Sequence, residues 1–110
     1  PFTGKRAKHE RLDFPGTRGS DILGVASGVG TWTGKKRGYG HLLEINHGNG
    51  FVTRYAHNDE LLVKAGDEIS SGQVIAKMGA TGRASSPHVH FEVLYNDKPV
   101  NPYQFVKQMR

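Results

Sequence analysis

The apolar residues of this chain fall in short runs, and each run is soon ended by Gly, Asn or Asp. No stretch has a convincing helical period except the terminal NPYQFVKQM, where Asn101 would cap a helical turn and Pro102 would begin it. Short strands at regular spacing with turn signals between them are typical of β-sandwiches and β-barrels. We therefore predict an all-β fold with little helix.

The candidate strands and turns can be placed along the chain. The turns are predicted at TGKKRGYG, HGNG, HND, KAGD, SSG and YND. The strands are predicted at Ile22–Val25, Gly28–Thr33, Leu42–Asn46, Phe51–Ala56, Glu68–Ile69, Val74–Met78, His88–Leu94 and near Pro99–Val100. A length of 110 residues suits one hydrophobic core, so we expect a single domain over residues 1–110. Because the chain begins at Pro1 and not at Met, we expect a fragment of a longer protein or a mature product.

Composition excludes several kinds of site and partner. The chain has no Cys, so a metal ion would have to be bound by His and carboxylate side chains. The net charge of +5 favours anionic partners. However, the basic segments GKRAK and GKKRG are not interleaved with aromatic residues, and we predict no nucleic-acid binding. No apolar run is long enough to span a bilayer, and a monomer is the default expectation.

Two histidines share one face of a predicted strand near the C-terminus. Alternation in the segment PHVHFEV places His88, His90 and Glu92 on one face. The alternate residues Val89, Phe91 and Val93 are apolar and are predicted to face the core. Two imidazoles on one rigid strand can supply two metal ligands, or one ligand and one acid–base group. Paired histidines are also common on exposed strands, so the pair alone does not decide between these interpretations.

Further candidate residues lie elsewhere in the chain. His9 and Asp13, in HERLD, are four residues apart and can converge on one ion from a helical turn or a tight loop. Together with His90 they would provide three ligands and leave a fourth position for water, as in catalytic zinc sites. His57, in TRYAHND, follows an apolar strand and opens a predicted polar turn. Each of these elements, taken alone, is also typical of solvated side chains.

Taken together, these segments resemble a known family. HERLD, GYGHLLEINHGNGFVTRYAHND, VKAGDEISSGQVIAKMGATGRASSPHVHFEV and VNPYQF are similar to the M23 (lysostaphin/LytM-type) zinc metallopeptidase domain of Gram-negative envelope endopeptidases. The resemblance covers essentially the whole chain, and the motifs occur in family order. It implies mainly antiparallel β-sheets that form a groove, barrel-sandwich-like. It also implies one Zn²⁺ per domain, bound by His9, Asp13 and His90, with His57 and His88 as catalytic residues outside the ligand set.

Other positions are assigned less directly. His41 and His47 match no ligand of the family, and we expect them to be surface or turn-supporting residues. Glu92 either orients a histidine of the site or is an exposed strand residue. Arg11 stands where the family usually has Gly, and Ser86 lies in ASSPHVH where the family usually reads STGPHLH. Arg11 would narrow the groove or meet a substrate carboxylate, so these departures bear on specificity.

The resemblance implies an activity and two alternatives. Zinc lowers the pKa of bound water towards ~7 and polarises a carbonyl group. The implied enzyme hydrolyses cross-links between peptide stems of peptidoglycan, at D-alanyl–meso-diaminopimelate bonds, in the cell envelope or periplasm or after secretion. One alternative is a glycyl-glycine endopeptidase of the lysostaphin kind. The other is a non-catalytic LytM-type domain that activates a cell-wall amidase; such relatives have lost ligands, whereas all five positions are present here.

Overall fold

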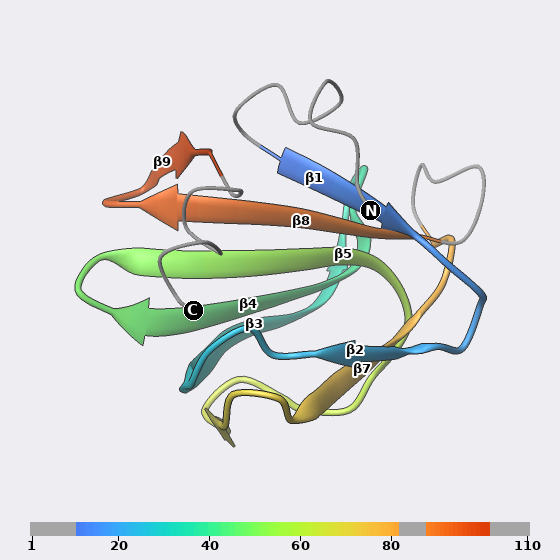
Figure 1. The fold of residues 1–110 in the computed structure, drawn as a ribbon, viewed down its shortest axis with the longest axis horizontal. Helices are drawn as coiled ribbons and strands as arrows, with labels where there is room; N and C mark the ends of the chain where they lie inside the picture. Colours follow the sequence, from blue (N-terminus) through green and yellow to red (C-terminus); the bar gives the residue numbers. More distant parts are fainter. Residues whose placement is uncertain (1–10, 82–87, 102–110) are drawn as a thin grey trace.

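The computed structural model describes residues 11–81 and 88–101, with the backbone alone for residues 11–15. This part of the chain consists of strands and turns (Figure 1). Its strands are β1 (Arg11–Pro15), β2 (Asp21–Leu23), β3 (Gly28–Lys36), β4 (Gly40–Gly48), β5 (Phe51–Leu61), β6 (Glu68–Ile69), β7 (Val74–Met78), β8 (His88–Tyr95) and β9 (Lys98–Val100). Among the described residues, no helix is present that has the length and apolar character required to span a membrane.

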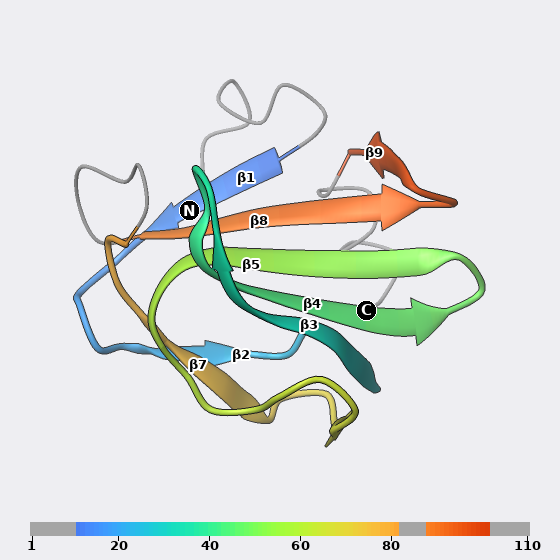
Figure 2. The same ribbon diagram turned by 180° about the vertical axis from the view of Figure 1, so that it is seen from behind.

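All the strands belong to one antiparallel sheet that curls on itself. The main order is β1-β8-β5-β4-β3-β6, and β9 adds to β8. The strands β8, β5 and β4 lie side by side, as both views show, while β2 and β7 form a separate arm (Figures 1 and 2). The long strand β5 connects the two parts. Its first half, up to Ala56, pairs with β8, and its second half, from Asn58 onward, pairs with β7.

The hydrophobic core lies inside the curl of this sheet. Alternate residues of the neighbouring strands meet there, and Leu43, Ile45, Ile75 and Val93 are completely buried. The prediction that Val89, Phe91 and Val93 face the core is confirmed, because all three are buried and belong to this cluster. The other face of β8 is therefore the one that carries His88, His90 and Glu92.

The predicted all-β fold with antiparallel strands is confirmed, but two local predictions were wrong. The predicted strands began at Ile22, whereas Arg11–Pro15 is also a strand and pairs with β8. Pro15 fits there because β1 lies at the edge of the sheet, where a missing N–H leaves no strand partner unpaired. HND was expected to be a turn, whereas β5 runs through it to Leu61. The predicted terminal helical turn lies outside the described residues beyond Asn101.

Candidate active site

His57 lies at the point where β5 changes partner from β8 to β7. Its φ is 65°, a left-handed conformation that is uncommon for residues other than glycine and costs free energy. Two hydrogen bonds hold it there. The backbone N–H donates to the carbonyl of Tyr39 at 2.8 Å, and ring Nδ1 donates to the carbonyl of Thr81 at 2.6 Å. The regular strand pairing of β5 is interrupted at this corner. The two hydrogen bonds hold His57 in place there, and the residue is only 7% exposed.

The hydrogen bond to Thr81 also determines where the proton of the His57 ring lies. A carbonyl oxygen can only accept, so Nδ1 carries the hydrogen. In the neutral ring the lone pair is then at Nε2. A histidine with one nitrogen anchored to the backbone and the other basic is suited to accept a proton from a reacting group.

Asn58 and Thr81 stabilise this corner through further hydrogen bonds. Asn58 is completely buried, and its amide donates to the carbonyls of His41 and Tyr55 at 2.9 and 2.8 Å. The Thr81 hydroxyl donates to the Asn58 carbonyl at 2.7 Å and accepts from the His41 N–H at 3.1 Å. The corner is therefore held by hydrogen bonds that join β4, β5 and the segment after β7.

The start of β8 lies directly beside this corner. The ring centroids of His57 and His88 are 5.0 Å apart, and those of His57 and His90 are 5.7 Å apart. The N–H of His88 donates to the carbonyl of Gly79 at 3.1 Å. A Cβ at Gly79 would lie 2.5 Å from the backbone nitrogen of Asp59 on β5. Only glycine therefore lets the chain at position 79 pass this close to β5. The fold thus brings together the three histidines that the sequence analysis selected from β5 and β8.

The register between β1 and β8 brings two further candidates to the site. Asp13 is the direct partner of His90, and Arg11 is the direct partner of Glu92. Asp13 and His90 are therefore neighbours along the paired backbones of β1 and β8. Among the side chains that the structure describes, no group of three or more forms a metal site. His9 and the side chain of Asp13 lie outside that set.

Glu92 contacts His90 directly. Its Oε2 accepts a 2.7 Å hydrogen bond from Nε2 of His90, and its Oε1 lies 3.4 Å from Nη1 of Arg54. Arg54 also pairs with Glu44 at 2.6 Å, so opposite charges alternate across β4, β5 and β8. Burial opposes ionisation of Glu92, but His90 and Arg54 outweigh that effect and hold the pKa of the carboxyl below its usual value.

The pairing of His90 with Glu92 fits a metal ligand. Because the carboxylate of Glu92 accepts from Nε2, the neutral ring has its lone pair at Nδ1. Histidines that bind metals usually donate their other ring N–H to a carboxylate in this way. Asp13 lies opposite on β1, and an aspartate and a histidine are both zinc donors. The residue types that β1 and β8 bring opposite each other here are thus ones that zinc accepts as ligands.

The structure adds residues that the sequence analysis missed. The Tyr39 ring lies edge-on to the His90 ring at 5.9 Å, and its hydroxyl donates to Oε2 of Glu92 at 3.4 Å. Burial and the charge of Glu92 raise the pKa of Tyr39. Nothing in the sequence indicated that Arg54 pairs with Glu92, because the two residues lie 38 positions apart. No local pattern in the sequence links Tyr39 or Thr81 to the histidines.

The two remaining described histidines have structural hydrogen bonds. Nδ1 of His41 lies 3.1 Å from the carbonyl of Asn58. His47 bridges the carbonyl of Ser27, at 2.7 Å from Nδ1, and the hydroxyl of Thr53, at 2.7 Å from Nε2. These contacts connect neighbouring strands and turns, which agrees with the turn-supporting role expected for both.

Comparison with known proteins gives a consistent family assignment. The model of peptidase family M23 matches residues 7–102. The murein hydrolase activator NlpD of Escherichia coli is 39% identical over 97% of the chain, and the DD-carboxypeptidase/endopeptidase Mpg of Neisseria meningitidis is 39% identical over 86%. The chain spans only 28% and 22% of the lengths of these two relatives.

Solved structures agree with this assignment. A Pseudomonas aeruginosa protein assigned to peptidase M23 superposes with a TM-score of 0.89 at 35% identity, over 96% of this chain and 46% of its own. A zinc-containing peptidase from Vibrio cholerae superposes with a TM-score of 0.81 at 37% identity, over 91% of this chain and 33% of its own. The likeness extends over the strands that carry the candidate site.

Proposed function

This chain belongs to peptidase family M23, and from that premise we propose that it is a zinc-dependent endopeptidase that cuts peptide cross-links of peptidoglycan. The observation that carries the proposal is the convergence of His57, His88 and His90 at the corner of β5, with Asp13 opposite His90. A purely structural role would not require three imidazoles at one place. The site of action would be the cell envelope.

His9, Asp13 and His90 would hold the metal in this proposal. When bound, zinc supplies the acidity that activates a water molecule at neutral pH and polarises the carbonyl of the scissile amide. The role of Glu92 is to keep the His90 ring in one tautomer and one orientation through the 2.7 Å hydrogen bond. The contacts with His90 and then Arg54 hold the pKa of Glu92 below its usual value.

His57 and His88 would carry the proton transfers. The anchored Nδ1 of His57 leaves Nε2 as the basic nitrogen, which favours His57 as the group that accepts a proton from the attacking water. His88, with its ring centroid 5.0 Å away, would stabilise the oxyanion or protonate the departing amine. Imidazole suits these steps because its pKa lies near neutral pH.

The D-alanyl–meso-diaminopimelate cross-link is the proposed substrate. Similarity to Mpg, which is named a DD-carboxypeptidase/endopeptidase, supports a bond that follows a D-residue. A glycyl-glycine bridge is the other enzyme substrate considered. The two substrates differ in charge near the scissile amide.

A second candidate function rests on a specific observation. NlpD, which is 39% identical to this chain, is named a murein hydrolase activator. A domain of this kind would bind and activate a cell-wall amidase without cutting the wall itself. The expected residues are present at all five positions (His9, Asp13, His57, His88 and His90). This favours the enzyme, because an activator needs neither metal ligands nor paired imidazoles.

Digestion of purified sacculi tests these functions together. The zinc-reconstituted chain should release fragments with new D-alanyl carboxyl and diaminopimelate amino termini, identified by mass spectrometry. Metal analysis should find about one zinc per chain, which is the stoichiometry expected for a single catalytic site. A chain that takes up no zinc would contradict the enzyme. A chain that releases nothing alone, but makes an added amidase release more, would establish the activator instead.

A further inference from the structure

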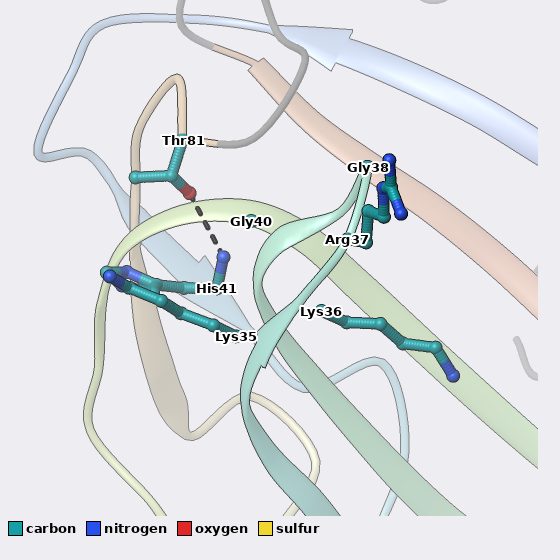
Figure 3. Close-up of a pocket in the computed structure, with 7 residues that line it drawn as sticks. All are labelled: Lys35, Lys36, Arg37, Gly38, Gly40, His41 and Thr81. Carbon is teal, nitrogen blue, oxygen red and sulfur yellow. Dashed lines mark hydrogen bonds between the residues drawn. The ribbon is translucent and has the colours of Figure 1, made fainter.

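A basic cavity lies next to the candidate site, at the hairpin that joins β3 and β4. It has a volume of about 540 Å³. Its wall includes Lys35, Lys36 and Arg37 from the hairpin, His41 from β4 and the side chain of Thr81 (Figure 3). Three formal positive charges on consecutive residues therefore line part of a space large enough for a small ligand group.

The positive charges of this hairpin are not neutralised within the described part of the protein. Lys35, Lys36 and Arg37 are all exposed, and none forms an ion pair with a described carboxylate. The amine of Lys36 lies 5.8 Å from the centre of the Trp32 ring, a contact that positions the charge without cancelling it. An anion entering the cavity would meet cations that have no competing partner among the described residues.

The hairpin register brings two cavity residues to the same face. Lys35 and His41 are direct partners across β3 and β4, so their side chains project from one side of the ribbon. Figure 3 shows both side chains extending to the same side of the hairpin, below Thr81, while Lys36 extends to the other side. Lys35 is thus the lysine best placed to meet a group held between the hairpin and Thr81.

Two contacts link the cavity to the candidate catalytic histidine. Thr81 lines the cavity, and its carbonyl accepts the 2.6 Å hydrogen bond from His57. The tip of the same hairpin contributes the Tyr39 carbonyl, which accepts from the His57 N–H. A group bound in the cavity would therefore lie beside the residues that anchor His57.

We propose that this cavity binds a free carboxylate of the peptide substrate, adjacent to the scissile amide. The inference rests on the proposed endopeptidase function and specifies its substrate class. In a D-alanyl–meso-diaminopimelate cross-link, the carbon that bears the scissile nitrogen also bears a free carboxylate. The interior of a glycine bridge has no such group. Lysine and arginine bind carboxylates through charge-assisted hydrogen bonds, so the hairpin would select the charged cross-link.

Binding of two matched peptides tests this inference. The peptides are the same D-alanyl–diaminopimelate cross-link with the adjacent carboxylate either free or converted to the carboxamide. Calorimetry would use the zinc-loaded chain carrying His88→Ala, so that neither peptide is cut during the measurement. The free acid should bind about fivefold more tightly than the amide, as expected for an exposed charge pair in a partly enclosed cavity.

Matched variants test whether Lys35 causes the preference for the free acid. Lys35→Gln should remove most of the preference for the free acid, and Lys35→Arg should retain it. Lys98→Gln, on β9 at the far end of β8, removes the same charge from an exposed position and should leave the preference unchanged. Equal affinity for the two peptides, failure of both to bind, or an equal loss in Lys98→Gln would each overturn the inference.

The result separates this inference from the proposed function. Sacculus digestion by the unsubstituted chain is measured independently of peptide affinity. A preference for the free acid without any hydrolysis would reject the enzyme and keep the carboxylate site. Hydrolysis of sacculi with no preference between the two peptides would keep the enzyme and reject the carboxylate site.

Discussion

His90 and Glu92, two residues apart on β8, are joined by a 2.7 Å hydrogen bond from Nε2 to Oε2. Both side chains project from the same face because strand residues alternate. A single strand thus supplies an imidazole and the carboxylate that orients it. Arg54 on β5 and Tyr39 on the hairpin then fix that carboxylate from two other directions.

Glu92→Gln should weaken zinc binding. A neutral amide is a poorer acceptor for the His90 ring N–H, and loss of such a partner typically costs 10–100-fold in metal affinity. Competition with a chromogenic chelator would measure the change. Glu44→Gln is the matched control: it removes the other carboxylate that pairs with Arg54 and leaves the His90–Glu92 bond in place. Equal zinc affinity in Glu92→Gln and the unsubstituted chain would contradict the orienting role.

Substitution of the two β8 histidines should separate metal binding from catalysis. His88→Ala should abolish release of fragments from sacculi while the chain keeps about one zinc, because His88 is proposed to act outside the ligand set. His90→Ala should lose the zinc as well as the activity. Metal analysis after dialysis, together with the digestion, gives both readouts. Loss of zinc in His88→Ala would show that the roles are assigned to the wrong histidines.

Asn58→Asp should destabilise the fold by about 3 kcal/mol or more, because a buried carboxylate would face two carbonyl oxygens and lose both donors. The Asn58 side chain is completely buried, and its amide donates two of the hydrogen bonds that hold the corner. Urea denaturation would measure the free energy of unfolding. Asn49→Asp, in an exposed turn, makes the same chemical change and should cost no more than about 0.5 kcal/mol. A similar effect at both positions would contradict the bracing role.

His47 should make the fold less stable in mild acid. Burial lowers the pKa of its imidazole, although the bond to the Ser27 carbonyl opposes the shift. In the unfolded chain a histidine titrates near pH ~6.5, so below that value the unfolded state binds more protons than the folded state. The contribution of His47 is therefore complete above the unfolded pKa and is lost as the pH falls towards the lower folded pKa.

Urea denaturation at pH 7.5 and at pH 5.0 would test this, with His47→Gln as the reference. Gln can occupy the site without titrating, so the unsubstituted chain should lose more stability between the two pH values than the variant does. An equal loss in both proteins would assign the acid sensitivity to other groups.

Much of the candidate site follows from local sequence rules. Alternation alone placed His88, His90 and Glu92 on one face of β8 and Phe91 on the other, since side-chain direction in a strand depends only on neighbouring residues. The same rule cannot show which strand lies beside β8. The strand Arg11–Pro15 was not predicted for this reason: its conformation depends on pairing with a segment about 80 residues away.

By itself, then, the sequence determined the all-β class, the core face of β8 and the set of candidate histidines. Tertiary structure decided the left-handed corner at His57, its anchoring by Thr81 and Tyr39, and the basic cavity beside it. The physical reason is the range of the interactions. Strand faces and turns are set by residues a few positions apart, whereas the corner and the cavity exist only where segments distant in the chain pair in one register.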